Sequence, residues 1–209
     1  MRPALWWAVL ALLAASAIAP HDRLTWALEI PWVAVGLAWC AWRRPPMTGL
    51  LAAALAVHAA VLVAGGLWTY ERVPLGEWWK DWFGFERNHY DRLGHLLQGF
   101  VPALMVREWF HHAGVRFPGP WLKGLAIIFA VEGFSAIFEL IEWAAAIILG
   151  GGAAAYLGSQ GDPWDAQADM LCCLIGATLA TVLFGRWQDR RLDAVAAPPT
   201  APSSAATRP

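Results

Sequence analysis

Acidic and imidazole side chains occur in three segments of this chain that are otherwise apolar and long enough to form membrane helices. Ionisable groups are costly in hydrocarbon, so they usually face a bundle interior or a wet cavity and mark a functional site. We therefore take six of them as candidate catalytic residues: Asp91, His95, Glu139, Glu142, Asp165 and Asp169.

Carboxylate and imidazole groups at these spacings could share one metal ion. Glu139 and Glu142 are three residues apart and Asp91 and His95 are four apart, so each pair lies on one helix face. Neighbouring carboxylates cannot all ionise unless protons or a cation neutralise them. Imidazole with carboxylates suits Zn, Mn or Fe, and a divalent metal could activate water to hydrolyse a lipid-linked phosphate or ester. The expected ligands are His95, Glu139, Glu142 and Asp169.

Further polar residues near the ends of the same segments are expected to line the entrance of the site. They are Asn88, Tyr90, Gln98, Gln160 and Trp164. With the orientation argued below, most of the ionisable groups fall in the outer half of the bilayer, and Glu132 alone lies near the middle. The predicted site therefore faces outward.

Two other functions fit these residues. Glu132, Glu139 and Glu142 could form a proton relay in a small transporter, which would have to dimerise because six spans are few for a monomeric carrier. The polar groups could instead hold the helices together by hydrogen bonds, in a non-catalytic accessory protein of the cell envelope. A relay across the membrane needs partners in the inner half, where the sequence offers few, so we favour the enzyme.

Six apolar stretches, each near the roughly 20 residues that a span requires, would position these side chains. They cover residues 4–20, 24–42, 49–69, 91–110, 122–149 and 166–186. The first also resembles a signal peptide, but we interpret it as an uncleaved span. The aromatic 70–90 connection is either an outer interfacial helix or an ordered loop. Residues 1–193 are expected to form one transmembrane bundle, and the tail 194–209 to be disordered.

Composition supports a membrane protein. Only 15% of the residues are charged, against about 25% in soluble domains. Many of the 15 Trp residues lie at segment ends, as in an interfacial aromatic belt. The net charge of −1 creates no field that would attract nucleic acid. The three cysteines all fall in apolar segments and are interpreted as small buried residues.

The distribution of positive charge places both termini in the cytoplasm. Arg and Lys gather after the second span, between the fourth and fifth spans, and after the sixth, whereas the 150–165 loop has none. The outer 70–92 connection is an exception, because it contains Arg72, Lys80, Arg87 and Arg92. The excess of Arg and Lys in the other loops outweighs this exception. The predicted fold class is therefore all-α, a polytopic membrane helix bundle of about six transmembrane helices.

Three blocks of sequence carry a family resemblance. NHYDRLGHLLQGF at 88–100, FELIEW at 138–143 and GDPWDAQADM at 161–170 resemble the YjdF-like inner-membrane proteins of bacteria. The resemblance covers most of the chain from the third span to the sixth and implies a multi-pass protein of the bacterial inner membrane. It implies no activity and no catalytic residue. The last block also has a fainter similarity to VanZ-like membrane proteins, which is an analogy of fold alone.

Overall fold

Every regular element in the described residues, 3–150 and 158–196, is a helix in this computed structural model. The α-helices are α1 (Pro3–Ser16), α2 (Arg23–Arg43), α3 (Gly49–Trp68), α4 (Pro74–Phe83), α5 (Tyr90–His112), α6 (Pro120–Leu149), α8 (Asp165–Leu179) and α9 (Gly185–Ala196). A 3-10 turn, η1 (Tyr70–Arg72), precedes α4, and a π-helical turn, η3 (Ala180–Phe184), joins α8 to α9. The all-helical prediction is confirmed. Most of the predicted disordered tail, from residue 197 onward, lies outside the described residues.

Within the described residues, four helices are long and apolar enough to cross a membrane. They are α2, α3, α6 and the continuous helix Asp165–Ala194, which includes α8, η3 and most of α9. Helix α1 has 14 residues and ends at Ser16, earlier than the predicted end of the first span. Helix α5 has 23 residues, but its polar side chains make it less apolar than these four.

Local sequence determines where several helices begin. The Asp22 carboxylate accepts a hydrogen bond from the Thr25 N–H (2.6 Å) at the start of α2, and the Thr48 hydroxyl accepts one from the Leu51 N–H (3.2 Å) at the start of α3. Such caps satisfy backbone donors that have no partner within the helix. Pro74 and Pro120 begin α4 and α6, where a missing N–H costs nothing.

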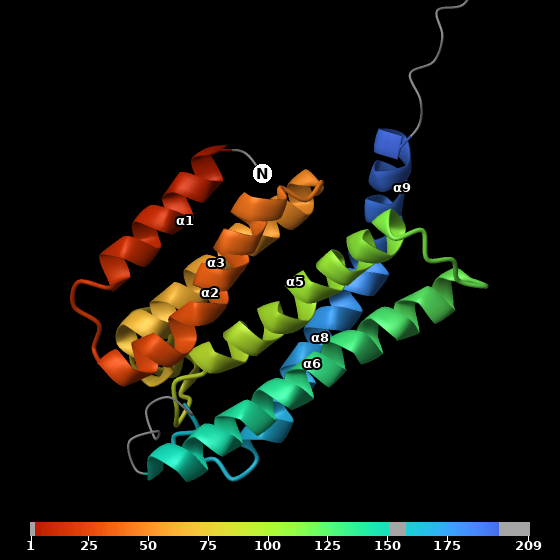
Figure 1. Ribbon diagram of the computed structural model, residues 1–209. Coiled ribbons are helices and arrows are strands. Elements are labelled where there is room, and N and C mark those ends of the chain that lie inside the picture. Colours follow the sequence, from red (N-terminus) through yellow and green to blue (C-terminus); the bar gives the residue numbers. More distant parts are fainter. Residues whose placement is uncertain (1–2, 151–157, 197–209) are drawn as a thin grey trace, which may run out of the picture.

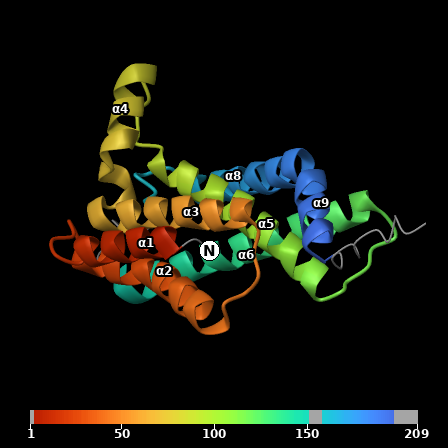
Figure 2. The same ribbon diagram turned by 90° about the horizontal axis from the view of Figure 1, so that it is seen from above.

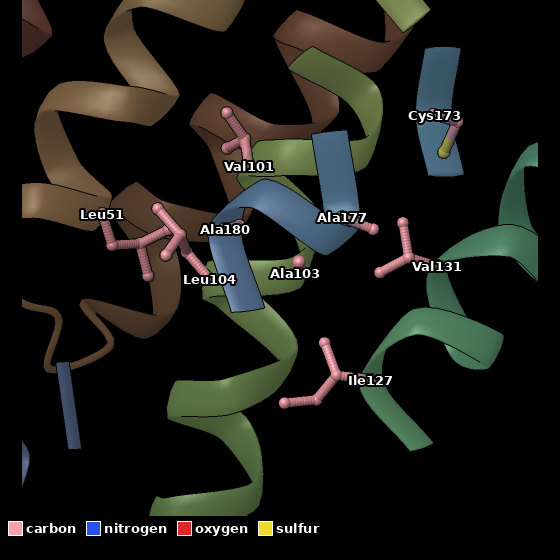
Figure 3. Close-up of a cluster of buried hydrophobic side chains, with 9 residues drawn as sticks. All are labelled: Leu51, Val101, Ala103, Leu104, Ile127, Val131, Cys173, Ala177 and Ala180. Carbon is pink, nitrogen blue, oxygen red and sulfur yellow. The ribbon is translucent and has the colours of Figure 1, made fainter. Parts of the chain in front are cut away.

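The helices form two groups that lie side by side, with α1, α2 and α3 in one and α5, α6 and α8 in the other (Figure 1). Helix α3 packs against α5 and joins the two groups. The larger hydrophobic core lies where α3, α5, α6 and the α8–η3 helix meet (Figure 3). Its nine buried residues are Leu51, Val101, Ala103, Leu104, Ile127, Val131, Cys173, Ala177 and Ala180.

The most extensive helix contact is between α5 and α8, and two glycines make it possible. A Cβ atom at Gly99 would overlap the carbonyl oxygen of Cys173, and one at Gly176 would overlap the carbonyl oxygen of Leu96. Small residues allow this close backbone approach between membrane helices. The approach brings the first turns of α5 and α8, which carry most of the candidate site residues, next to each other.

Polar contacts at the opposite end of the bundle tie α3, α5 and α9 together. The buried Glu108 carboxylate accepts hydrogen bonds from the Thr48 N–H (3.1 Å), the Thr48 hydroxyl (2.5 Å) and the Gln188 side-chain amide (2.8 Å). Asp189 pairs with Arg107 (2.9 Å) and Lys123 (2.8 Å). These contacts place the end of α5 and the starts of α3 and α6 on the same side as α9.

Helix α4 projects from the bundle near the opposite end of α3 and runs crosswise to that helix (Figure 2). Trp78, Trp82 and Phe83 are exposed on it. The 70–90 connection therefore contains a short helix with an exposed aromatic surface.

Candidate functional site

Two neighbouring helices bring three predicted site residues together. Asp91 and His95 lie one turn apart on α5, and Asp169 faces them from α8; all three are buried. His95 Nε2 is 3.6 Å from Asp91 Oδ1 and 3.6 Å from Asp169 Oδ1. Each residue can offer one ligand atom such that all three atoms lie within 4.8 Å of one another. Since metal–ligand bonds are roughly 2.0–2.6 Å long, this spacing suits one shared cation.

Helix α6 contributes a fourth group to the same centre. Glu139 Oε1 is 3.8 Å from His95 Nδ1, and neither atom has a hydrogen-bond partner among the described residues. Glu142, one turn further along α6, lines a cavity together with Asp91 and His95. Asp91, His95 and Glu142 therefore line the cavity, whereas Asp169 and Glu139 approach His95 from α8 and α6 without bordering the cavity.

Arg92 and Arg87 hold the start of α8 against the start of α5. The Arg92 guanidinium donates to Asp165 (2.7 Å) and Asp162 (3.2 Å) and also contacts Asp169. Arg87 donates to the same two carboxylates, those of Asp165 (2.8 Å) and Asp162 (3.2 Å). Asp165, predicted as a catalytic group, is thus engaged by two cations. Bidentate and bridging arginines are well suited to fix carboxylates in this way.

The charge of Asp162, in the loop before α8, is stabilised by its surroundings. The Trp164 backbone N–H donates to this carboxylate (2.9 Å) and, together with the nearby arginines Arg87 and Arg92, lowers its pKa. Hydrogen bonds and positive neighbours both favour the ionised form.

The predicted entrance residues have four different environments. Asn88 and Gln160 bind each other, because the Asn88 N–H donates to Gln160 Oε1 (3.0 Å) and Gln160 Nε2 donates to the Asn88 carbonyl (2.8 Å). Tyr90 is buried and donates its hydroxyl to the Val61 carbonyl (3.2 Å), so its polar end is used in packing. Trp164 is exposed, whereas Gln98 is buried and lines the cavity.

Three residues that contact or line this site, Tyr70, Glu29 and Arg92, are not among the predicted site residues. Tyr70 donates its hydroxyl to the Glu29 carboxylate (3.1 Å), both are buried, and both line the cavity beside Asp91. Glu29 was interpretable only as an acid near the end of an otherwise apolar span. Arg92 is one of the positive residues of the 70–92 connection that depart from the charge rule, and its position beside the acids of two segments is a signal of pairing.

The cavity itself has a volume of about 250 Å³. It lies between α2, α3, α5 and α6, with additional contacts from α1. Acidic residues gather at one end of it: Glu29, Asp91 and Glu142, beside Tyr70 and His95. Most of its other lining residues are apolar or aromatic. The arrangement thus combines an ionisable centre with an apolar chamber, which is the usual character of a small-molecule site.

Residues 2–190 match a family described as "Predicted membrane protein (DUF2238)". The chain belongs to this family. Inner membrane protein YjdF of Escherichia coli (strain K12) is 42% identical to it over 177 residues, which is 84% of each protein. No solved structure matches the chain.

Membership of DUF2238 confirms three of the sequence predictions. The chain is a multi-helix membrane protein embedded in the lipid bilayer, it resembles YjdF-like proteins, and it is placed in the bacterial inner membrane by its relative. Large apolar side chains exposed around the DUF2238 bundle, such as Phe129, Trp143 and Ile148, are in keeping with a lipid environment. The chemistry of the site has to be argued from its geometry.

Proposed function

We propose that this DUF2238 protein is a membrane-embedded hydrolase that uses a divalent metal and acts on a lipid-linked phosphate or ester at the outer side of the inner membrane. The observation that carries the proposal is the meeting of Asp91, His95 and Asp169, whose ligand atoms lie within 4.8 Å of one another beside an apolar cavity.

The outward orientation of the site is inferred from the distribution of positively charged residues. In the proposed topology, residues 1–193 form one bundle of six spans, with α1 and α5 added to the four most apolar helices and both termini in the cytoplasm. Arg107, Lys123 and Asp189 meet at one end, next to the Arg- and Lys-rich loops, and the candidate site lies towards the other. Loops rich in Arg and Lys stay in the cytoplasm.

The donor set fits Zn or Mn better than Mg or Ca, because it includes an imidazole. Asp91, His95 and Asp169 would hold the ion, which would supply an activated water or a polarised oxygen. Glu139 and Glu142 are the acid–base candidates, since both face the centre from α6. Arg92 would stabilise negative charge on the substrate, while Arg87 and Asp165 would hold the Arg92 guanidinium in position.

Metal analysis of the detergent-purified protein tests this proposal. Wild-type protein should contain close to one zinc or manganese per chain, and His95→Ala or Asp169→Asn should lower that content severalfold. His58→Ala is the matched control, because His58 lines the same cavity outside the group of three. Glu139→Gln should retain the metal and lose hydrolysis of lipid esters or phosphates. Metal-free wild-type protein would overturn the metal centre.

Proton-coupled transport is the second candidate, favoured by the line of ionisable side chains along the cavity wall. Glu29, Asp91, Glu142 and His58 all border it. This hypothesis would use a homodimer and expects Glu142→Gln, at the acid of the predicted relay that borders the cavity, to abolish pH-dependent uptake into proteoliposomes while Asp165→Asn spares it. Isosteric replacements that lower stability and leave a cellular phenotype intact would instead indicate a non-catalytic accessory protein of the envelope.

A further inference from the structure

Aromatic side chains border the apolar chamber where α2 faces α6. Trp32 of α2 lies against Phe138 (ring centroids 5.8 Å apart) and Phe134 (6.5 Å) of α6. Trp32 and Phe134 are 41% and 43% exposed, and both also line the cavity. Side chains change rotamer far faster than helices move, so these aromatic side chains could let a molecule pass from lipid into the chamber.

The chamber is long as well as narrow. It is bordered by Gly94 and Pro102 on α5 and by Glu29 and Cys40 on α2. At about 1.5 Å per residue these pairs span roughly 12 and 16 Å along the helices. A volume of about 250 Å³ is slightly below the approximately 300–1,000 Å³ of sites for drug-sized ligands. These dimensions suit one extended chain.

Polarity changes along the length of the chamber. The acidic end holds Asp91 and His95, whereas Leu37, Cys40 and Leu55 border the other end. Between them, Gln98 is buried and its Nε2 has no hydrogen-bond acceptor among the described residues. Leaving a buried donor unpaired is unfavourable, so a ligand oxygen at this depth would be stabilised.

From these features we infer that the chamber binds one hydrocarbon chain of a bilayer lipid, which enters sideways between Trp32 and Phe138. Its oxygen-bearing linkage lies beside Gln98, and its polar head lies at the Asp91–His95–Asp169 centre. The inference deepens the proposed function and rests on it for the reaction alone, because chain binding requires neither metal nor turnover.

Two glycines provide matched variants for a test. Gly36 lines the chamber, and a Cβ atom there would meet nothing within 4 Å, so Gly36→Trp would fill the space without a backbone clash. Gly133 on α6 is equally open and does not border the chamber, so Gly133→Trp is the control. If Gly36→Trp fails to fold, Gly36→Leu introduces a smaller side chain at the same position.

The measurement is photolabelling of metal-free protein in phosphatidylethanolamine–phosphatidylglycerol vesicles that contain phosphatidylglycerol with a diazirine on one acyl chain. Peptides carrying Leu37 and Ala59 should be labelled in wild type and Gly133→Trp. In Gly36→Trp the labelling should fall about tenfold, the ratio produced by a loss of about 1.4 kcal/mol of binding free energy. Absent labelling inside the chamber, equal labelling in both variants, or a chamber covered by a second copy of the chain would overturn the inference. Metal content is measured separately, so failure of the metal centre is distinguishable from failure of chain binding.

Discussion

Arg92 donates a hydrogen bond to Asp165 over 2.7 Å and so connects the first turn of α5 to the first turn of α8. Both side chains are largely buried, at 13% and 14% exposure. The same guanidinium contacts Asp169, one turn further along α8. One arginine therefore sets the separation of two helices whose acids and histidine form the candidate centre.

Removing this arginine should be far more harmful than removing an exposed one. Arg92→Ala leaves the buried Asp169 without its cation and Asp165 with Arg87 alone, and breaking a buried pair costs about 3–5 kcal/mol. Arg72→Ala is the control, because Arg72 is exposed and its one ion pair among the described residues is with Glu71, and exposed pairs contribute about 0–1 kcal/mol. Thermal unfolding in detergent measures both. Equal losses in the two variants would contradict the structural role of Arg92.

The close crossing of α5 and α8 predicts intolerance of larger residues at Gly99. Gly99→Ala would force its new methyl group against the Cys173 carbonyl, and overpacking typically costs about 1–3 kcal/mol. Because the helices must separate, metal content should fall together with the free energy of unfolding. Gly133→Ala, with open space around it, should change neither quantity, and a tolerant Gly99→Ala would refute the crossing.

Glu108 should stabilise the fold at the end of the bundle away from the site. Glu108→Gln replaces a carboxylate that accepts from Thr48 and Gln188, and hydrogen bonds to charged groups are worth about 1.5–3 kcal/mol. The free energy of unfolding should fall while metal content is unchanged. The exposed Glu86 provides the control Glu86→Gln. Loss of metal in Glu108→Gln would show that the two ends are coupled.

Acid should weaken the loop before α8 through Asp162. Its pKa is lowered in the folded state from an ordinary value of 3.8, so its contribution to stability is present above about pH 3.8 and disappears as pH falls through the lower, folded value. The difference in melting temperature between wild type and Asp162→Asn should thus be largest at neutral pH and shrink in acid. A difference in melting temperature that grows on acidification would contradict this prediction.

Helix α4 is expected to rest in the outer membrane interface through its exposed aromatic side chains, as amphipathic helices do. A nitroxide at Trp82→Cys should be accessible to oxygen dissolved in lipid. A nitroxide at Asp81→Cys, the neighbouring exposed acid, should be more accessible to a water-soluble nickel complex. Electron paramagnetic resonance measures both accessibilities, and equal values at the two positions would indicate an ordinary solvated loop.

Much of the helical architecture was predictable because hydrophobic length is a local property. Residues 24–42, 49–69 and 122–149 were expected to be spans, and α2, α3 and α6 match them closely. The first predicted span, 4–20, is longer than helix α1, which ends at Ser16. There the Ser16 hydroxyl donates to the Leu13 carbonyl and accepts from the Trp26 indole, so the chain turns early.

The amino-acid sequence by itself determined that the protein is a helical membrane protein and which segments carry ionisable groups, because both depend on composition and spacing along one helix. Only the tertiary structure decided which of those groups meet. Asp91 and His95 find Asp169 because Gly99 and Gly176 let α5 and α8 approach, and Glu29 reaches the same chamber through Tyr70. Such contacts join residues far apart in the chain, and they depend on how side chains of different helices fill a shared space.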